Sequence, residues 1–225
     1  MSDVIVKTEK LGRQLAGEVP VTLVEDISIE VRSGEFVAIT GPSGSGKSSL
    51  LYLLGLLDRP TSGRIWLNGI ETSTYGEDRL ADVRLAELGF VFQSHFLLPE
   101  FSALENVMLP MQRLGRLSTA DIKARAMDVL TDLGLADQAH KLPKQMSGGQ
   151  SQRVAIARAL ANEPRLILAD EPTGNLDTKS SATVQEILRH LAREHDRAVV
   201  AVTHDPVFAA SADRRIVIVD GRIAA

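Results

Sequence analysis

The sequence predicts an α/β fold in which helices cover both faces of a mostly parallel sheet. Four short apolar runs indicate the strands: FVAIT at 36–40, RLILA at 165–169, AVVAVT at 198–203 and RIVIV at 215–219, which we expect to be the last strand. Continuous apolar runs of this length are typical of parallel strands buried on both faces. Helical patterns separate the runs, including an amphipathic one at 178–194, and this alternation predicts a parallel sheet between helices.

The other segments extend this fold. Residues 19–31 and 89–93 are predicted strands, residues 64–70 form a short strand around an Asn-Gly turn, and residues 47–57 form an apolar helix. Helical patterns dominate between about 102 and 161, with apolar residues at helical spacing from Ile122 to Leu133 and Gly134 at the helix end. We therefore expect a helical lobe inserted into the α/β core.

The composition limits the possible functions. The chain has 225 residues, of which 44% are hydrophobic, so it can bury a substantial core. Its net charge of -4 argues against a nucleic-acid partner, and the lack of cysteine excludes disulfides and thiolate metal sites. The first ten residues lack a signal-peptide core, and the longest apolar stretch, at 50–57, is far shorter than the roughly 20 residues of a membrane span. We expect a soluble chain that reaches a membrane only through a partner.

A phosphate loop is predicted at residues 41–48. Their sequence, GPSGSGKS, matches the pattern G-x-x-x-x-G-K-[ST] between a predicted strand and a predicted helix. Glycines let the backbone turn its amides toward phosphate oxygens, and the N-terminus of the next helix adds positive potential. We expect Lys47 to reach the β- and γ-phosphates of a nucleotide and Ser48 to place its hydroxyl on Mg²⁺. A plain Gly/Ser turn is the alternative.

Two acidic residues, Asp170 and Glu171, follow the apolar run that ends at 169. A carboxylate at the end of a buried strand beside a phosphate loop is a natural Mg²⁺ position. We expect Asp170 to hold the ion and Glu171 to polarise the attacking water. Taken without the phosphate loop, the pair could equally be two solvated acids at a strand end.

A second anion-binding segment is predicted at Ser147, Gly148, Gly149 and Gln150, where a helix begins. Ser147 is a suitable N-cap, and the two glycines expose amides at the positive helix end. The phosphate loop already surrounds one side of a triphosphate. The second segment therefore requires another ligand, or the far side of a ligand held by a second copy in a symmetric head-to-tail pair. An ordinary capped helix is the alternative.

Together these motifs resemble the ABC ATPase family over nearly the whole chain and in the family's order. Residues 41–49 resemble Walker A, residues 147–160 (SGGQSQRVAIARAL) the family's C motif, and residues 166–172 (LILADEP) Walker B with its catalytic glutamate. Gln93 resembles the Q-loop glutamine, which contacts Mg²⁺ and couples to the membrane subunit. Residues 174–177 (GNLD) resemble the D-loop at the dimer contact, and His204 resembles the switch histidine that senses the γ-phosphate.

The resemblance implies a P-loop NTPase core with a mostly parallel sheet, an antiparallel N-terminal β subdomain and an inserted helical lobe. It implies one domain over residues 1–225, with the α/β core at 1–93 and 162–225 and the helical subdomain at about 94–161. The implied catalytic residues are Glu171, His204 and Lys47, and the implied Mg²⁺ ligands are Ser48, Gln93 and Asp170. The residues expected to bind ATP are Gly41, Ser43, Gly44, Ser45, Gly46, Lys47, Ser48, Ser49, Gln93, Ser147, Gly148, Gly149 and Gln150.

Residues 90–110 and 170–177 resemble the lipoprotein-release and macrolide-efflux (LolD/MacB) branch, and the whole chain resembles its YbbA-type ATPases. This branch implies a homodimer formed through ATP. It also implies an integral membrane permease with four transmembrane helices and an extracytoplasmic domain, of export or mechanotransmission type. The chain would then be cytoplasmic and peripheral on the inner face of the plasma membrane, with no nucleic acid bound. The alternative is a soluble ABC-type ATPase of DNA repair, although the chain has no room for the long insertions of that class.

Two stretches depart from the family or leave a choice open. No aromatic residue precedes Phe36, whereas the family stacks adenine on one; residues 11–15 offer leucines and Arg13, which predicts weak discrimination between ATP and GTP. Residues 94–109 are the expected contact for the permease. Their apolar residues, Phe96, Leu97, Leu98 and Phe101, either meet this partner or pack internally.

Overall fold

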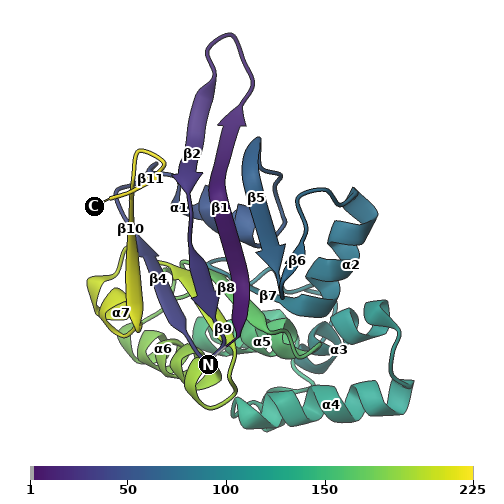
Figure 1. The fold of residues 1–225 in the computed structure, drawn as a ribbon. Coiled ribbons are helices and arrows are strands. Elements are labelled where there is room, and N and C mark those ends of the chain that lie inside the picture. The colour runs from purple at the N-terminus through teal and green to yellow at the C-terminus, as the bar shows by residue number, and fades with distance from the viewer. Residues whose placement is uncertain (1–2, 225) are drawn as a thin grey trace.

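The larger of two sheets is mostly parallel. The structure, a computed structural model, describes residues 3–224, and its six-stranded sheet follows the order β11-β10-β4-β9-β8-β7 (Figure 1). All pairs from β10 to β7 are parallel, as predicted, and β11 is antiparallel to β10. The strands are β4 (Phe36–Thr40), β7 (Leu88–Phe92), β8 (Leu166–Asp170), β9 (Ala198–Val202), β10 (Arg214–Val219) and β11 (Arg222–Ile223).

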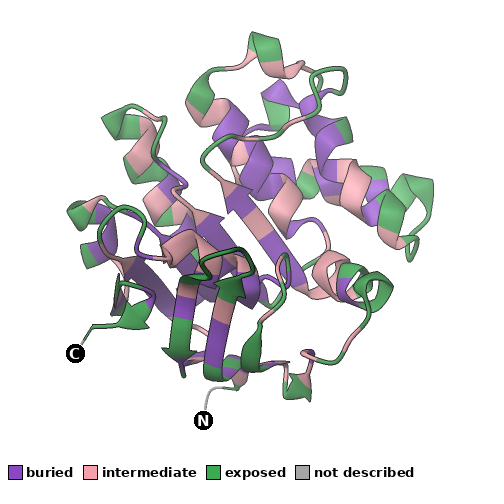
Figure 2. Ribbon diagram, turned by 90° about the horizontal axis from the view of Figure 1, so that it is seen from above, coloured by how far each residue is buried: buried purple, intermediate pink, exposed green. Residues whose placement is uncertain are grey.

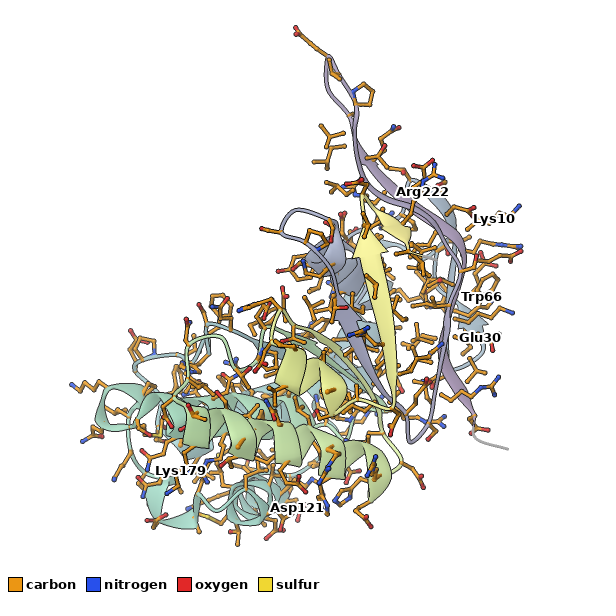
Figure 3. All side chains as sticks on the ribbon, turned by 90° about the vertical axis from the view of Figure 1, so that its left-hand side faces the viewer. Lys10, Glu30, Trp66, Asp121, Lys179 and Arg222 are labelled. Carbon is orange, nitrogen blue, oxygen red and sulfur yellow. The ribbon has the colours of Figure 1, made fainter. Side chains whose placement is uncertain are left out.

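The second sheet is antiparallel and comes from the N-terminal part of the chain, as the family resemblance implied. Its order is β2-β1-β5-β6, with β3 also paired to β1. In Figure 1 the β1–β2 hairpin extends away from the rest of the molecule, and Figure 3 places Trp66, Lys10 and Glu30 on this sheet. The strands are β1 (Val4–Leu15), β2 (Val21–Ile27), β3 (Glu30–Arg32), β5 (Ser62–Leu67) and β6 (Ile70–Glu71).

Most helices lie on one side of the parallel sheet. Helices α3 to α6 gather there in Figure 1, whereas α1 lies between the two sheets. Within residues 3–224, no helix has the length and apolar character needed to cross a bilayer. The helices are α1 (Lys47–Leu54), α2 (Glu77–Glu87), α3 (Ala103–Leu114), α4 (Thr119–Asp132), α5 (Gly148–Leu160), α6 (Thr178–Arg193) and α7 (Pro206–Ala210), with 3₁₀ turns at Ala136–Gln138 and Pro143–Gln145.

Alternate residues of the parallel strands enter two different cores. In β8, Ile167 and Ala169 pack into the cluster built with α3 to α6, whereas Leu166 and Leu168 pack into the cluster built with α1 and the antiparallel sheet. Burial is therefore deepest along the strands and on the inner faces of the helices (Figure 2). This two-sided burial explains why the strands are continuous apolar runs rather than alternating ones.

The structure corrects several element predictions. RIVIV is not the last strand, because a turn with positive φ at Asp220 and Gly221 (48° and 78°) returns the chain into β11. The predicted strand at 19–31 is divided, with Asp26 at φ 54° shortly before the break between β2 and β3. The helix predicted at 47–57 ends at Leu54.

Strand β1 and helix α2 were not predicted. Charged and polar residues interrupt the apolar alternation of β1. Helix α2 buries only Leu80, so its sequence carries almost no apolar face that could mark a helix.

Replacing the fully buried Leu168 with alanine is expected to lower the free energy of unfolding by about 2–5 kcal/mol, because the cavity opens beneath two packed layers. Leu117, which is 47% exposed, provides the same substitution at the surface, with an expected change within about 0.5 kcal/mol. Urea unfolding followed by circular dichroism measures both. Equal losses in the two variants would contradict the core described above.

Candidate functional site

The phosphate loop, residues 41–48, runs from the end of β4 into α1. The backbone of two other segments packs against it, one on each side. A Cβ at Gly41 (φ 146°) would overlap the carbonyl oxygen of Ile218, and one at Gly46 (φ 99°) would overlap that of Leu23. Ser45 O also accepts a hydrogen bond from Gly221 N at 2.9 Å. Glycine is therefore required at 41 and 46 both for the backbone angle and for the close approach.

The polar groups of the loop are arranged for an anion. Lys47 Nζ donates to the loop's own carbonyl at Pro42 (2.7 Å), and α1 begins after Gly46 without a side-chain cap. Among the described residues, the buried Oγ of Ser45 has no hydrogen-bond partner. Uncapped amides, a lysine and an unsatisfied hydroxyl are the groups that phosphate oxygens would satisfy. Ser43 and Gly44 of the loop are exposed, and Ser49 follows the loop in the first turn of α1.

Asp170, at the end of β8, accepts one hydrogen bond on each carboxylate oxygen. Ser48 Oγ donates to Oδ1 and the hydroxyl of Tyr52 donates to Oδ2, both at 3.0 Å. Burial raises the pKa of Tyr52, and the hydrogen bond and negative charge of Asp170 raise it further. Tyr52 therefore remains a neutral donor at physiological pH. Tyr52 is not among the site residues predicted from the sequence, although its position one helical turn after Ser48 on α1 places both hydroxyls on one face.

Glu171 and His204 form a second pair beside Asp170. His204 Nδ1 lies 2.9 Å from Glu171 Oε2, and the exposed histidine comes from the end of β9, next to β8 in the sheet. Glu171 N donates to Val202 O at 3.0 Å, although Glu171 has a φ of 48°, which is uncommon for a residue other than glycine. This unusual backbone places the Glu171 carboxylate on the side of His204, where an open cavity of about 490 Å³ adjoins both residues.

Gln93, just after β7, is held by another loop. Its Nε2 donates to Asn175 Oδ1 at 3.1 Å, and Asn175 Nδ2 donates back to Gln93 O at 3.4 Å. Gly174 leaves the space that the amide occupies, because a Cβ there would lie 2.7 Å from Gln93 Nε2. Among the described residues, the side chain of Gln93 is hydrogen-bonded to Asn175 and not to Ser48 or Asp170.

The second anion-binding segment, Ser147 to Gln150, has the predicted cap at the start of α5. Ser147 Oγ accepts from Gln150 N at 3.2 Å, and Gln150 Oε1 accepts from Ser147 N at 2.9 Å. A Cβ at Gly148 would lie closest to Leu176, just before α6, and a Cβ at Gly149 would lie closest to Ser180 of α6. Among the described residues, none of the phosphate loop comes as near. Within residues 3–224, the neighbours of the two glycines are thus Leu176 and Ser180, and not residues of the phosphate loop.

The donor set beside the phosphate loop fits Mg²⁺. Ser48 and Asp170 supply a hydroxyl and a carboxylate that are already in contact. These hard oxygen donors are of the kind that bind Mg²⁺ together with the phosphate oxygens of a nucleotide and with water.

The parallel sheet, and the site at the ends of its strands beside the phosphate loop, define an ATP-hydrolysing protein with a phosphate loop. The sequence profile of the ABC transporter family matches residues 24–174, and the chain belongs to this family.

Relatives and solved structures agree with this family. The lipoprotein-releasing system ATP-binding protein LolD 1 of Chlorobium chlorochromatii is 50% identical over 100% of this chain and 92% of its own length. The macrolide export ATP-binding/permease protein MacB of Bartonella henselae is 48% identical, over 100% of this chain and 34% of its own length.

A dimeric structure of the ATP-binding cassette MJ0796 in a post-hydrolysis state with ADP and Pi has a TM-score of 0.90 and 40% identity, covering 98% of this chain and 97% of that one. The predicted membership in the LolD/MacB branch and the predicted fold class are confirmed.

Replacing Tyr52 with phenylalanine is expected to weaken the binding of Mg²⁺ with ATP by about 10- to 100-fold, because Asp170 loses one of its two orienting donors. Binding of a fluorescent ATP analogue, titrated with Mg²⁺ and separately in EDTA, measures this change. Affinity without metal should not change. Tyr75→Phe, the same substitution on a ring that faces Arg79, is the control. An unchanged Mg²⁺ titration in Tyr52→Phe would show that the hydroxyl does not orient Asp170.

Proposed function

We propose that two copies of this chain close head-to-tail on two ATP molecules and drive an integral membrane permease, for export or mechanotransmission. The observation that carries the proposal is the convergence of two pairs, Ser48 with Asp170 and Glu171 with His204, on one edge of the sheet. The names LolD and MacB, borne by relatives that cover the whole chain, support a partner that releases or exports its substrate.

ATP is held through its phosphates. The amides of the phosphate loop and of the first turn of α1 face the phosphate oxygens, and Lys47 exchanges its bond with the Pro42 carbonyl for the β- and γ-phosphates. Base recognition is weak, because Arg13, in the stretch where the family carries an aromatic residue, is paired with Asp58 at 2.7 Å. Of the residues predicted from the sequence to bind ATP, those in and next to the phosphate loop are Gly41, Ser43, Gly44, Ser45, Gly46, Lys47, Ser48 and Ser49.

Ser48 and Asp170 would hold Mg²⁺, and Gln93 would join them once its amide leaves Asn175. When bound, the ion neutralises charge on the phosphate oxygens. Tyr52 keeps the Asp170 carboxylate turned so that the oxygen beside Ser48 faces this position. The bond between Gln93 and Asn175 belongs to a resting arrangement, and its exchange is part of closure.

Hydrolysis depends on positioning and electrostatics. Glu171 orients the attacking water and accepts its proton, and His204, 2.9 Å from the same carboxylate, fixes its direction and meets the γ-phosphate. Lys47 stabilises the charge that develops on the transferred group. The catalytic residues are thus Glu171, His204 and Lys47.

A second copy completes the site. Ser147, Gly148, Gly149 and Gln150 form the capped, positive N-terminal end of α5. In a head-to-tail pair this segment meets the ATP bound to the other copy. Closure then links ATP binding to motion, and hydrolysis resets it.

The surface at 94–101 is the proposed contact for the permease. Phe96 is 65% exposed and Leu98 and Phe101 are 42% and 37% exposed, whereas Leu97 packs against the core. Arg158, from α5, fixes this loop by donating to the carbonyls of His95 (2.9 Å) and Phe96 (2.6 Å). An adjacent groove of about 370 Å³, lined mainly by α2, β7, α3 and α5, extends the surface.

The permease is proposed to have four transmembrane helices and an extracytoplasmic domain. Its cytoplasmic side would hold this chain at the inner face of the plasma membrane. The resemblance to the LolD/MacB branch supports both statements.

Glu171→Gln is expected to reduce ATP hydrolysis by about 100-fold or more while keeping ATP binding, because the amide cannot accept the proton of water. With ATP and Mg²⁺ the variant should therefore accumulate as a dimer, as measured by light scattering after size exclusion. Glu194→Gln, at the exposed end of α6, is the control and should behave as the wild type. Hydrolysis at the wild-type rate in Glu171→Gln would remove Glu171 from its assigned role.

The trapped variant also tests the partner. Glu171→Gln, purified from native membranes in ATP, is expected to bring down a permease with four transmembrane helices and a large external domain. Recovery of DNA, or of soluble proteins alone, would leave an ABC ATPase whose assigned partner is wrong.

Phe96→Ser and Phe101→Ser are expected to abolish the stimulation of hydrolysis by the permease and to keep basal hydrolysis, because both rings are exposed and lie outside the phosphate site. ATPase rates with and without the copurified permease measure this. Ile70→Ser, at a residue that is 58% exposed on the antiparallel sheet, is the control. A loss of the folded state in the Phe variants would instead favour internal packing.

A further inference from the structure

Gln152 is a buried polar residue on α5 that the predicted mechanism does not use. It lies five residues after Ser147, and its side chain is fully buried. Its Nε2 donates to two backbone carbonyls, that of Phe92 at 3.2 Å and that of Pro172 at 2.6 Å. A primary amide has two N–H groups, so each carbonyl receives its own hydrogen.

Phe92 is the last residue of β7, and Pro172 lies two residues after the end of β8, so both carbonyls lie where these strands lead into the site. Strands β7 and β8 pair in parallel, and their last register pair is Phe92 with Asp170. Beyond this pair, the segments that follow β7 and β8 separate toward Gln93 and Glu171. Gln152 therefore connects these two segments at the point where the hydrogen bonds between β7 and β8 end.

Glu171 is fixed from both sides by this arrangement. Its N–H donates to Val202 of β9 at 3.0 Å, and the carbonyl of the next residue, Pro172, is held by Gln152. Because Glu171 has a φ of 48°, its backbone depends on such neighbours to keep this angle.

The side chain is not what packing alone would select. Among the described residues, Gln152 Oε1 is buried without a hydrogen-bond partner. An apolar side chain of the same size would fill the space without an unsatisfied oxygen, which is costly in a core. The two donated bonds are the feature that distinguishes glutamine here.

We propose that Gln152 is a positioning residue for ATP hydrolysis, which sets Gln93 relative to Glu171 and links both to the second anion-binding segment at the start of the same helix. The inference rests on the roles proposed above for these residues. Movement of α5 would thus reach both the carboxylate that orients the attacking water and the Mg²⁺ ligand Gln93 through one side chain.

The test compares Gln152→Met and Gln152→Asn with Gln138→Met in the full chain. Gln138 is the matched control: it is also a buried amide in the helical region, its Oε1 also lacks a recorded partner among the described residues, and its Nε2 donates to Asp137 rather than to either strand. The measurements are kcat and KM for ATP, the number of nucleotide sites from a fluorescent ATP analogue, and the melting temperature.

Gln152→Met is expected to lower kcat per nucleotide site by roughly 10- to 100-fold, with little change in KM because the phosphate loop is untouched. Gln152→Asn keeps the amide but is too short to reach both carbonyls, so a smaller loss of kcat is expected; this variant decides the question if Gln152→Met does not fold. Gln138→Met should keep its kcat at whatever melting temperature it shows.

The inference is overturned by a wild-type kcat per site in the folded Gln152 variants, or by an equal loss in Gln138→Met. Glu171→Gln is measured in parallel. If it keeps the wild-type kcat, the proposed roles fail and the inference fails with them. If Glu171→Gln is inactive while the Gln152 variants match the wild type, only the inference fails.

Discussion

The parallel pairing of β4, β9, β8 and β7 is the constraint on which the site depends. Strands paired in parallel register end at the same edge of a sheet, so the segments that follow them meet there. The register is fixed because alternate side chains of each strand enter two different cores, and a slip of one residue would exchange them. Asp170, Glu171 and His204 are thus brought to the phosphate loop by the packing of apolar residues that take no part in the chemistry.

The sequence predicted what local signals determine. The buried strands, the phosphate loop and the cap at Ser147 each depend on residues that are adjacent or a few positions apart, and the structure has all three. Glu171 and His204 lie close together because they follow β8 and β9, which are neighbours in the sheet. Strand β1, helix α2 and β11 were missed, because β1 mixes charged residues into its pattern, α2 has almost no apolar face, and β11 consists of two residues after a turn.

Contacts between distant side chains were beyond prediction for a different reason. Tyr52 and Asp170 are 118 residues apart, and Gln152 and Phe92 are 60 residues apart. The helical spacing from Ser48 places Tyr52 on the face of the site, but its bond to Asp170, like the bonds of Gln152, is determined by how α1 and α5 pack on the sheet. The bond between Gln93 and Asn175 belongs to the same class, since each residue lies in a loop whose course depends on tertiary packing.

The confinement of the phosphate loop has a thermodynamic consequence. Backbone from β2 lies against Gly46, backbone from β10 lies against Gly41, and the turn after β10 is bonded to Ser45. These contacts fix the backbone of the loop when the protein folds. The loop is therefore a preformed binding site, and it loses little conformational entropy when a triphosphate binds. Association is then governed by diffusion and by the exchange of water and of the lysine's internal bond, and the ligand adapts to the loop rather than the loop to the ligand.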